Sequence, residues 1–198
     1  MSNLFAIFIF TNLILFLSFI FGVITLIFNR NLTKKTIIIL LVISFCLFLI
    51  YSGFLAFLQY KLWQKSPVMK YAIPPYDGLG YFLVYSYHLF FKKILWRVVS
   101  AVSVLTLIFI FNKLFKSSLF YSEEFYLLTY LGFLIEFPLG LFLLPIGLLI
   151  LMFAHLLQPK KALSTKYSFK HYWSYAAILI IIINITLTYA GIIYKIQP

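Results

Sequence analysis

The chain has 198 residues, of which 64% are hydrophobic and only 10% charged. This composition excludes a soluble globular domain, because a globule of this size needs far more polar surface to cover its core. Sixteen Lys and Arg outnumber four acids and give a formal net charge of +12, and the cations lie in short segments beside apolar runs. That pattern indicates anionic lipid headgroups, and not nucleic acid, as the partner of the positive charge.

The first apolar stretch, residues 3–28, is uncharged and longer than the roughly 20 residues needed to cross a hydrocarbon layer. The first cation is Arg30 and no small-residue cleavage site follows it, so we expect a retained transmembrane helix and not a signal peptide. Small and polar residues share one face of this helix, which predicts that the face meets protein. These residues are Thr11, Ser18, Gly22, Thr25 and Asn29.

A second span is predicted for residues 36–60, after a short basic turn. A connection of that length predicts an antiparallel helical hairpin. The loop that follows, residues 61–80, is too rich in proline and glycine to form one continuous helix. It contains Pro67, Pro74, Pro75, Gly78 and Gly80.

Residues 81–91 are apolar and aromatic but too few to cross a membrane unless they join the segment that follows. We therefore expect an interfacial or re-entrant segment there. Residues 94–115 form the third predicted span. Arg97 lies near its start, so we expect this side chain to extend to the membrane surface.

The fourth predicted span, residues 125–157, contains one acid, Glu136. A straight helix over this stretch would reach about 50 Å at 1.5 Å per residue, well beyond a hydrocarbon core of roughly 30 Å. Because Pro138 and Pro145 interrupt it, we expect a bend or a break. Either residues 125–137 lie along the interface and residues 138–157 cross, or the whole element crosses with a tilt and a kink.

Glycines surround Glu136 at helical spacing. Gly132 lies four residues before the acid, Gly140 four residues after it, and Gly147 seven residues further on. One face of the predicted helix is therefore small, and the acid belongs to that face. We predict that these glycines form a packing seam against other helices.

A basic loop at residues 158–171 precedes the last predicted span, residues 172–194. In that span Asn184, Thr188 and Gly191 follow one another at steps of four and three. They form a polar and small stripe that we expect to face protein.

These elements predict an all-α, polytopic membrane protein, with a single helical domain over residues 1–198. It has about five transmembrane helices and one interfacial or re-entrant segment. The strong use of Phe, Ile, Leu, Tyr and Lys favours a bacterial cell membrane or an organelle inner membrane. More Lys and Arg lie on the side of the membrane that holds residues 61–97 and 158–171 than on the other side, which favours an amino terminus inside. The first helix has cations only after it, which favours the reverse.

Glu136 is the strongest candidate for chemistry, because an ionisable group inside an apolar span is costly and usually faces a bundle interior or water. One interpretation is a carboxylate that relays protons or binds ions, with backbone carbonyls exposed beside Pro138. The other is a glutamate that hydrogen-bonds the polar stripe of a neighbouring helix, at Asn184 or Thr25. We favour the second.

The three histidines raise the question of haem b, which needs two axial imidazoles from facing helices. A haem between His88 and His155 is one arrangement, but no pair has the spacing of a two-haem bundle, and with His171 they all fall near predicted boundaries. We therefore expect no cofactor. Glu123 and Glu124 suit the positive field at a helix N-terminus.

The sequence contains no phosphate-binding glycine loop, no metal-ligand spacing and no nucleophile motif. We therefore predict no catalytic and no metal-binding residue. The features favour a non-catalytic integral membrane subunit that packs against the lipid bilayer and other membrane proteins in a larger complex. The alternative is a small secondary transporter or a proton- or ion-conducting protein that uses Glu136, with His155 and Asn184 as further candidates.

Overall fold

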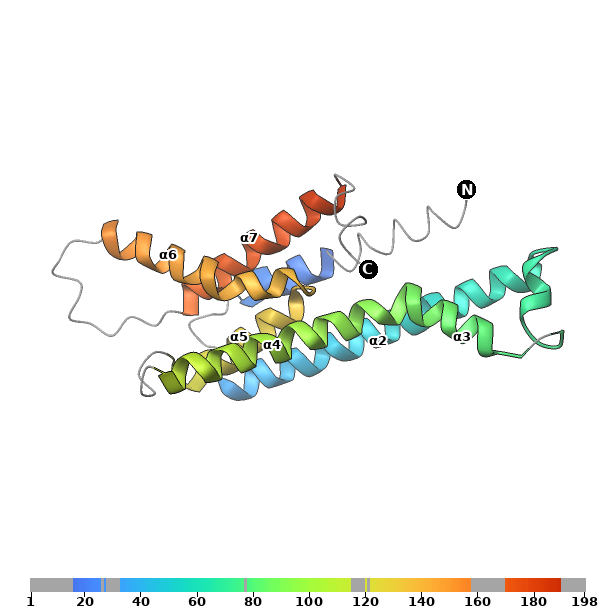
Figure 1. The fold of residues 1–198 in the computed structure, drawn as a ribbon, viewed down its shortest axis with the longest axis horizontal. Helices are drawn as coiled ribbons and strands as arrows, with labels where there is room; N and C mark the ends of the chain where they lie inside the picture. Colours follow the sequence, from blue (N-terminus) through green and yellow to red (C-terminus); the bar gives the residue numbers. More distant parts are fainter. Residues whose placement is uncertain are drawn as a thin grey trace. The chain divides into compact units, whose positions relative to one another are not determined.

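The computed structural model describes residues 16–25, 27, 33–76, 78–114, 120, 122–157 and 170–189. These residues form helices and turns with no strand among them, so the predicted all-α class is confirmed (Figure 1). Gly191 lies outside the described residues, and so do the side chains of Thr188, His155 and His171. After a helical stretch at residues 16–25, the labelled α-helices are α2 (Lys34–Lys65), α3 (Gly80–Ser86), α4 (Lys92–Leu114), α5 (Ser122–Leu134), α6 (Leu143–Leu157) and α7 (Lys170–Tyr189).

The chain forms two compact units. The first unit consists of the described residues of Leu41–Trp96, and the second consists of those of Met1–Leu40 and Arg97–Pro198. The long helices α2 and α4 each contribute residues to both units. The single domain expected from the sequence stays a prediction.

The unit of residues 41–96 is a helical hairpin. Its outgoing helix, α2, continues to Lys65 and ends just before Pro67, because the residue before a proline is pushed out of the helical region. The return runs through α3, the short π-helix η3 (Tyr87–Phe91) and the start of α4. The Ser52 hydroxyl donates a hydrogen bond to the carbonyl of Phe90 at 3.2 Å, which fixes the register of the hairpin.

The predicted separation of residues 81–91 from the next span is not seen. Gly80–Leu114 is one helical stretch of 35 residues, in which the π-turn at η3 joins α3 to α4. The sequence favours this outcome because no proline or glycine lies between residues 81 and 114. The interfacial placement of its first part stays a prediction.

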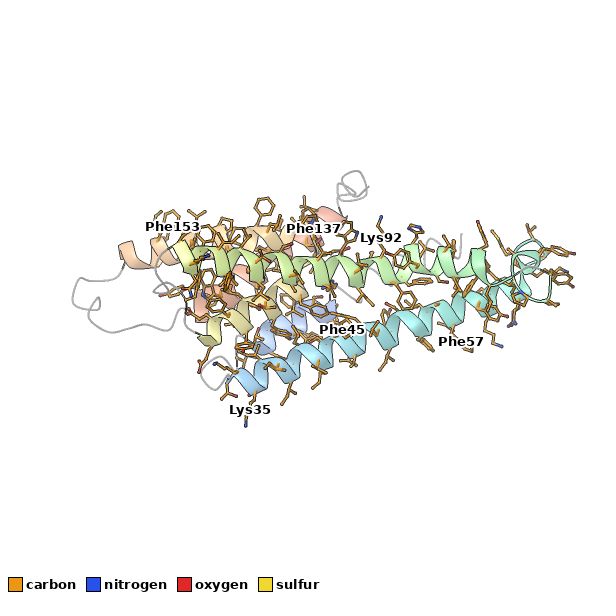
Figure 2. The ribbon with its side chains drawn as sticks, turned by 60° about the horizontal axis from the view of Figure 1, so that its bottom comes forward. Lys35, Phe45, Phe57, Lys92, Phe137 and Phe153 are labelled. Atoms are coloured by element: carbon orange, nitrogen blue, oxygen red, sulfur yellow. The ribbon has the colours of Figure 1, made fainter. Side chains whose placement is uncertain are left out.

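In the second unit, the stretch predicted as one kinked span is two helices. The helix α5 ends at Leu134, and the chain passes through the short 3-10 helix η4 (Leu139–Phe142) into α6. In both views α6 runs back toward the side on which α5 begins, with Phe137 labelled near the turn (Figure 1 and Figure 2). The proline at 138 lacks a backbone N–H, so the helix breaks here.

The core of the second unit is built around α5. From Leu127 to Glu136 every residue except Thr129 is buried, as expected for a short helix that is apolar on all sides. The helix α7 packs against both α5 and α6. Ser18, Gly22 and Thr25, which share a face of the first helical stretch, are all buried.

Within the part of the chain that the structure describes, two helical stretches are long and apolar enough to cross a membrane: α2 and Gly80–Leu114. Only 22% and 33% of their most apolar windows are buried inside the protein, whereas the core helix of a soluble protein would be mostly buried. Large apolar side chains therefore face outward along both, for example Phe54 at 55% and Phe109 at 63% exposed. This exposure supports a membrane location.

Candidate functional site

Glu136 lies at the break between α5 and η4. Glu136 is only 9% exposed, and its backbone carbonyl accepts a hydrogen bond from the Gly140 N–H at 3.3 Å. One backbone hydrogen bond therefore spans the turn. The Glu136 carboxylate at this turn lies inside the second unit. A buried carboxylate needs a compensating charge or hydrogen-bond donors.

Arg97 on α4 supplies that charge. Its guanidinium is 1% exposed, and Nη1 donates to the carbonyls of Leu134 and, at 3.5 Å, Phe133. These carbonyls belong to the last turn of α5, where helix carbonyls lack an intrahelical partner and carry the negative end of the helix dipole. Glu136 adds an electrostatic attraction to the same guanidinium.

This interaction was not predicted from the sequence. We expected Arg97 to extend to the membrane surface, but its side chain is buried against the end of α5. A signal was present: Arg97, Ser100, Ala101 and Val104 fall on one face of α4 at helical spacing. All four are buried.

The same face of α4 makes close contact with the glycines near Glu136. A Cβ at Gly132 would lie 3.0 Å from Val104 Cγ2, and a Cβ at Gly140 would lie 1.8 Å from the Ser100 hydroxyl oxygen. Ser100 also donates a hydrogen bond to the Gly132 carbonyl at 2.8 Å. Small residues thus let α4 approach both the end of α5 and the start of η4.

Gly147 has a different neighbour. A Cβ there would lie 2.2 Å from the ring of Trp173 on α7, and this indole is 2% exposed. Gly132 and Gly140 therefore contact α4, whereas Gly147 contacts α7. All three glycines thus face side chains of this same chain.

The other candidate residues have separate surroundings. Gly22 makes ordinary contacts with Ile178 and Ile181 of α7, and the Thr25 hydroxyl donates to the Gly22 carbonyl at 2.6 Å. Asn184 on α7 is buried at 5% exposure. The sequence suggested Asn184 or Thr25 as the partner of Glu136. The structure instead gives Glu136 an electrostatic interaction with Arg97, which was not predicted.

Three further ionisable residues singled out from the sequence have described positions. His88 in η3 is exposed and packs edge-on against Tyr87 at 5.4 Å between ring centroids. Glu123 and Glu124 lie in the first turn of α5, as predicted. Among the described residues, no group of three His, Cys, Asp or Glu side chains could hold a metal ion.

The arrangement at Arg97 combines two opposite charges with the end of a buried helix. Such a pair can hold helices in one geometry, or can change partners when a proton or an ion enters. Comparison with known protein families, curated proteins and solved structures finds no match for this chain.

Proposed function

We propose that the protein is a multi-pass integral membrane subunit without catalytic activity, which packs against other membrane proteins in a larger complex. In this proposal the chain crosses the bilayer about five times, and the first turns of the helical stretch Gly80–Leu114 lie at the interface. The residues 158–171 and the turn at 66–79 lie outside the hydrocarbon.

The observation that carries the proposal is the burial of Arg97 against α5 and Glu136. Glu136 has a positive neighbour on a packed helix, which favours a structural role for the acid over that of a lone titrating group. A core held together by such a pair suits a scaffold. The outward apolar faces of α2 and Gly80–Leu114 offer the contact area for lipid and for partner helices.

Purification of the tagged protein from its native membrane in a mild detergent tests the proposal. We expect recovery of one defined complex in which other membrane proteins are present in a fixed stoichiometry, measured by native mass spectrometry. A tagged membrane protein of similar size from the same cells serves as the control for carry-over. Recovery of this chain only as a monomer or as a homo-oligomer would contradict the proposal.

A second function has one specific observation in its favour. The helix α5 is short and buried and ends beside a buried charge pair, which resembles the interrupted helices that bind ions in transporters. In this alternative Glu136 is the titrating group. Purified protein in liposomes would then move protons or an ion, and Glu136→Gln would abolish the flux while leaving the protein folded; an impermeable liposome would exclude this alternative.

A further inference from the structure

The end of the hairpin formed by residues 41–96 has a small core of its own. Trp63, Ile73 and Phe82 are buried there, and Tyr60, Ala72 and Tyr85 pack against them. The Trp63 ring lies 4.8 Å from that of Tyr85 and 5.3 Å from that of Phe82, measured between centroids. We call residues 60–86 the hairpin tip.

The outer surface of the hairpin tip is both apolar and basic. Val68 is 72% exposed, Tyr76 62% and Tyr81 59%. Three lysines lie among these side chains, at positions 61, 65 and 70, and the only acid of the segment in the sequence is Asp77. A surface with exposed tyrosines and lysines is typical of a segment that lies among lipid headgroups.

We propose that the hairpin tip is a binding surface for anionic phospholipid headgroups, with the aromatic side chains within the headgroup layer and the lysines on the phosphates. This inference needs only that the chain spans a bilayer, and it is independent of any partner protein. It therefore goes beyond the proposed subunit role, and an experiment can contradict either proposal without contradicting the other.

The length of α2 places the hairpin tip at the required depth. The uncharged run from residue 36 to residue 60 is centred on Phe48, and Trp63 follows fifteen residues later. At 1.5 Å per residue this separation is about 22 Å, which is the distance from the bilayer centre to the outer part of the headgroup layer. The Trp63 cluster then lies at the interface while Phe54 and Phe57 remain in hydrocarbon.

The competing depth would put Lys92 and Lys93 in the headgroup layer. The Ser52 to Phe90 hydrogen bond sets Lys92 about level with Ile50 on the antiparallel α2, so Trp63 would then lie about 20 Å further out in water. Exposed apolar side chains would be lost to water along that whole length, including Phe57 at 55% and Leu83 at 59% exposed. Lys92 and Lys93 are instead partly buried and already have interactions within the protein, which makes the deeper position tolerable.

The charge of the hairpin tip determines which lipid it prefers. A lysine close to an anionic surface strengthens binding by roughly fivefold, and this contribution is screened by salt. The tip carries three lysines and one acid, so it prefers phosphatidylglycerol to phosphatidylcholine.

The test uses the full chain with Trp96→Phe and Trp173→Phe, which leaves Trp63 as the only tryptophan. The protein is reconstituted into bilayers made of equal parts phosphatidylcholine and phosphatidylglycerol, with one of the two lipids brominated. We expect quenching of Trp63 by lipids brominated near the glycerol backbone, weak quenching by lipids brominated at the chain ends, and stronger quenching by phosphatidylglycerol. Salt should remove the lipid preference.

Replacement of Lys61, Lys65 and Lys70 by Gln should lower the preference for phosphatidylglycerol at least about fivefold. The matched control replaces Lys34, Lys35 and Lys113 by Gln, which removes three exposed lysines elsewhere and should leave the preference at Trp63 unchanged. A Trp63 that no brominated lipid quenches would overturn the proposal, and so would equal quenching by both lipids at low salt. If the Gln variant fails to fold, the salt dependence of the parent protein still decides the question.

Discussion

Ser100 on α4 and Gly140 in η4 lie so close that a Cβ on residue 140 would be 1.8 Å from the Ser100 hydroxyl oxygen. Ser100 is fully buried, and its hydroxyl is held by a hydrogen bond to the Gly132 carbonyl. Turning the hydroxyl away would break this buried hydrogen bond. The contact holds the turn after Glu136 against α4.

Gly140→Ala should destabilise the protein by about 2 kcal/mol, because overpacking of a closed contact forces the neighbouring elements apart. Thermal unfolding in detergent, followed by circular dichroism, measures the change. In the Ser100→Ala background the same substitution should cost less, since the nearest contact then becomes the Cβ of residue 100 at 3.1 Å. Gly53→Ala is the control, because a Cβ there meets nothing within 4 Å; an equal effect at both glycines would contradict the prediction.

Gly147→Ala should displace the Trp173 ring. A Cβ at Gly147 would lie within 2.3 Å of two ring atoms, and the buried indole is also held by Phe120 at 5.8 Å between centroids. We expect a loss of about 2 kcal/mol together with a changed near-ultraviolet dichroism of the tryptophan. In a Trp173→Leu background, where the ring is absent, the added methyl group should have a much smaller effect, and an undiminished effect there would show that the cause lies elsewhere.

Trp63→Ala should open the hairpin tip, because it removes the largest side chain of that cluster. Large-to-small changes at buried aromatic residues cost about 3 kcal/mol or more, which corresponds to about a 100-fold larger open population. Trypsin should then cut after Lys65 or Lys70 correspondingly faster in detergent-solubilised protein. Tyr71→Ala is the control, since Tyr71 is 55% exposed and its ring packs on Tyr76, outside the Trp63 cluster; equal cleavage of the two variants would argue against a separate core.

The sequence predicted much of the fold because local rules decide it. The prolines at 138 and 145 predicted a bend or a break; the chain breaks near 138, whereas α6 continues through 145. The prolines and glycines from 67 to 80 predicted the turn between two helices. The direction of α6 after the break was not predictable, because a broken helix leaves the angle between its halves to tertiary packing. The π-turn at η3 was also missed, since no local residue pattern announces it.

Of the two charged residues at the candidate site, only one was predicted from the sequence. Glu136 was identified because an acid in an apolar run is conspicuous, whereas Arg97 near the start of a predicted span had an ordinary explanation at the membrane surface. Only the packing of α4 on the end of α5 brings the two together, and that contact joins residues more than thirty positions apart. No rule of sequence spacing reaches across that separation.

The last prediction concerns this pair directly. Arg97→Gln should destabilise the protein by about 3 kcal/mol, because it leaves the carboxylate of Glu136 and the carbonyls at the end of α5 without their positive charge. Glu136→Gln should cost less, since Arg97 keeps the carbonyls of Phe133 and Leu134. The double variant should be more stable than the sum of the single changes predicts, by about 1 kcal/mol or more, because neither charge is then left buried alone.

Lys113→Gln, at the exposed end of α4, is the control and should leave the unfolding temperature unchanged. Strict additivity of the two substitutions in thermal unfolding would show that the charges do not depend on each other, and would remove the structural role assigned to Glu136.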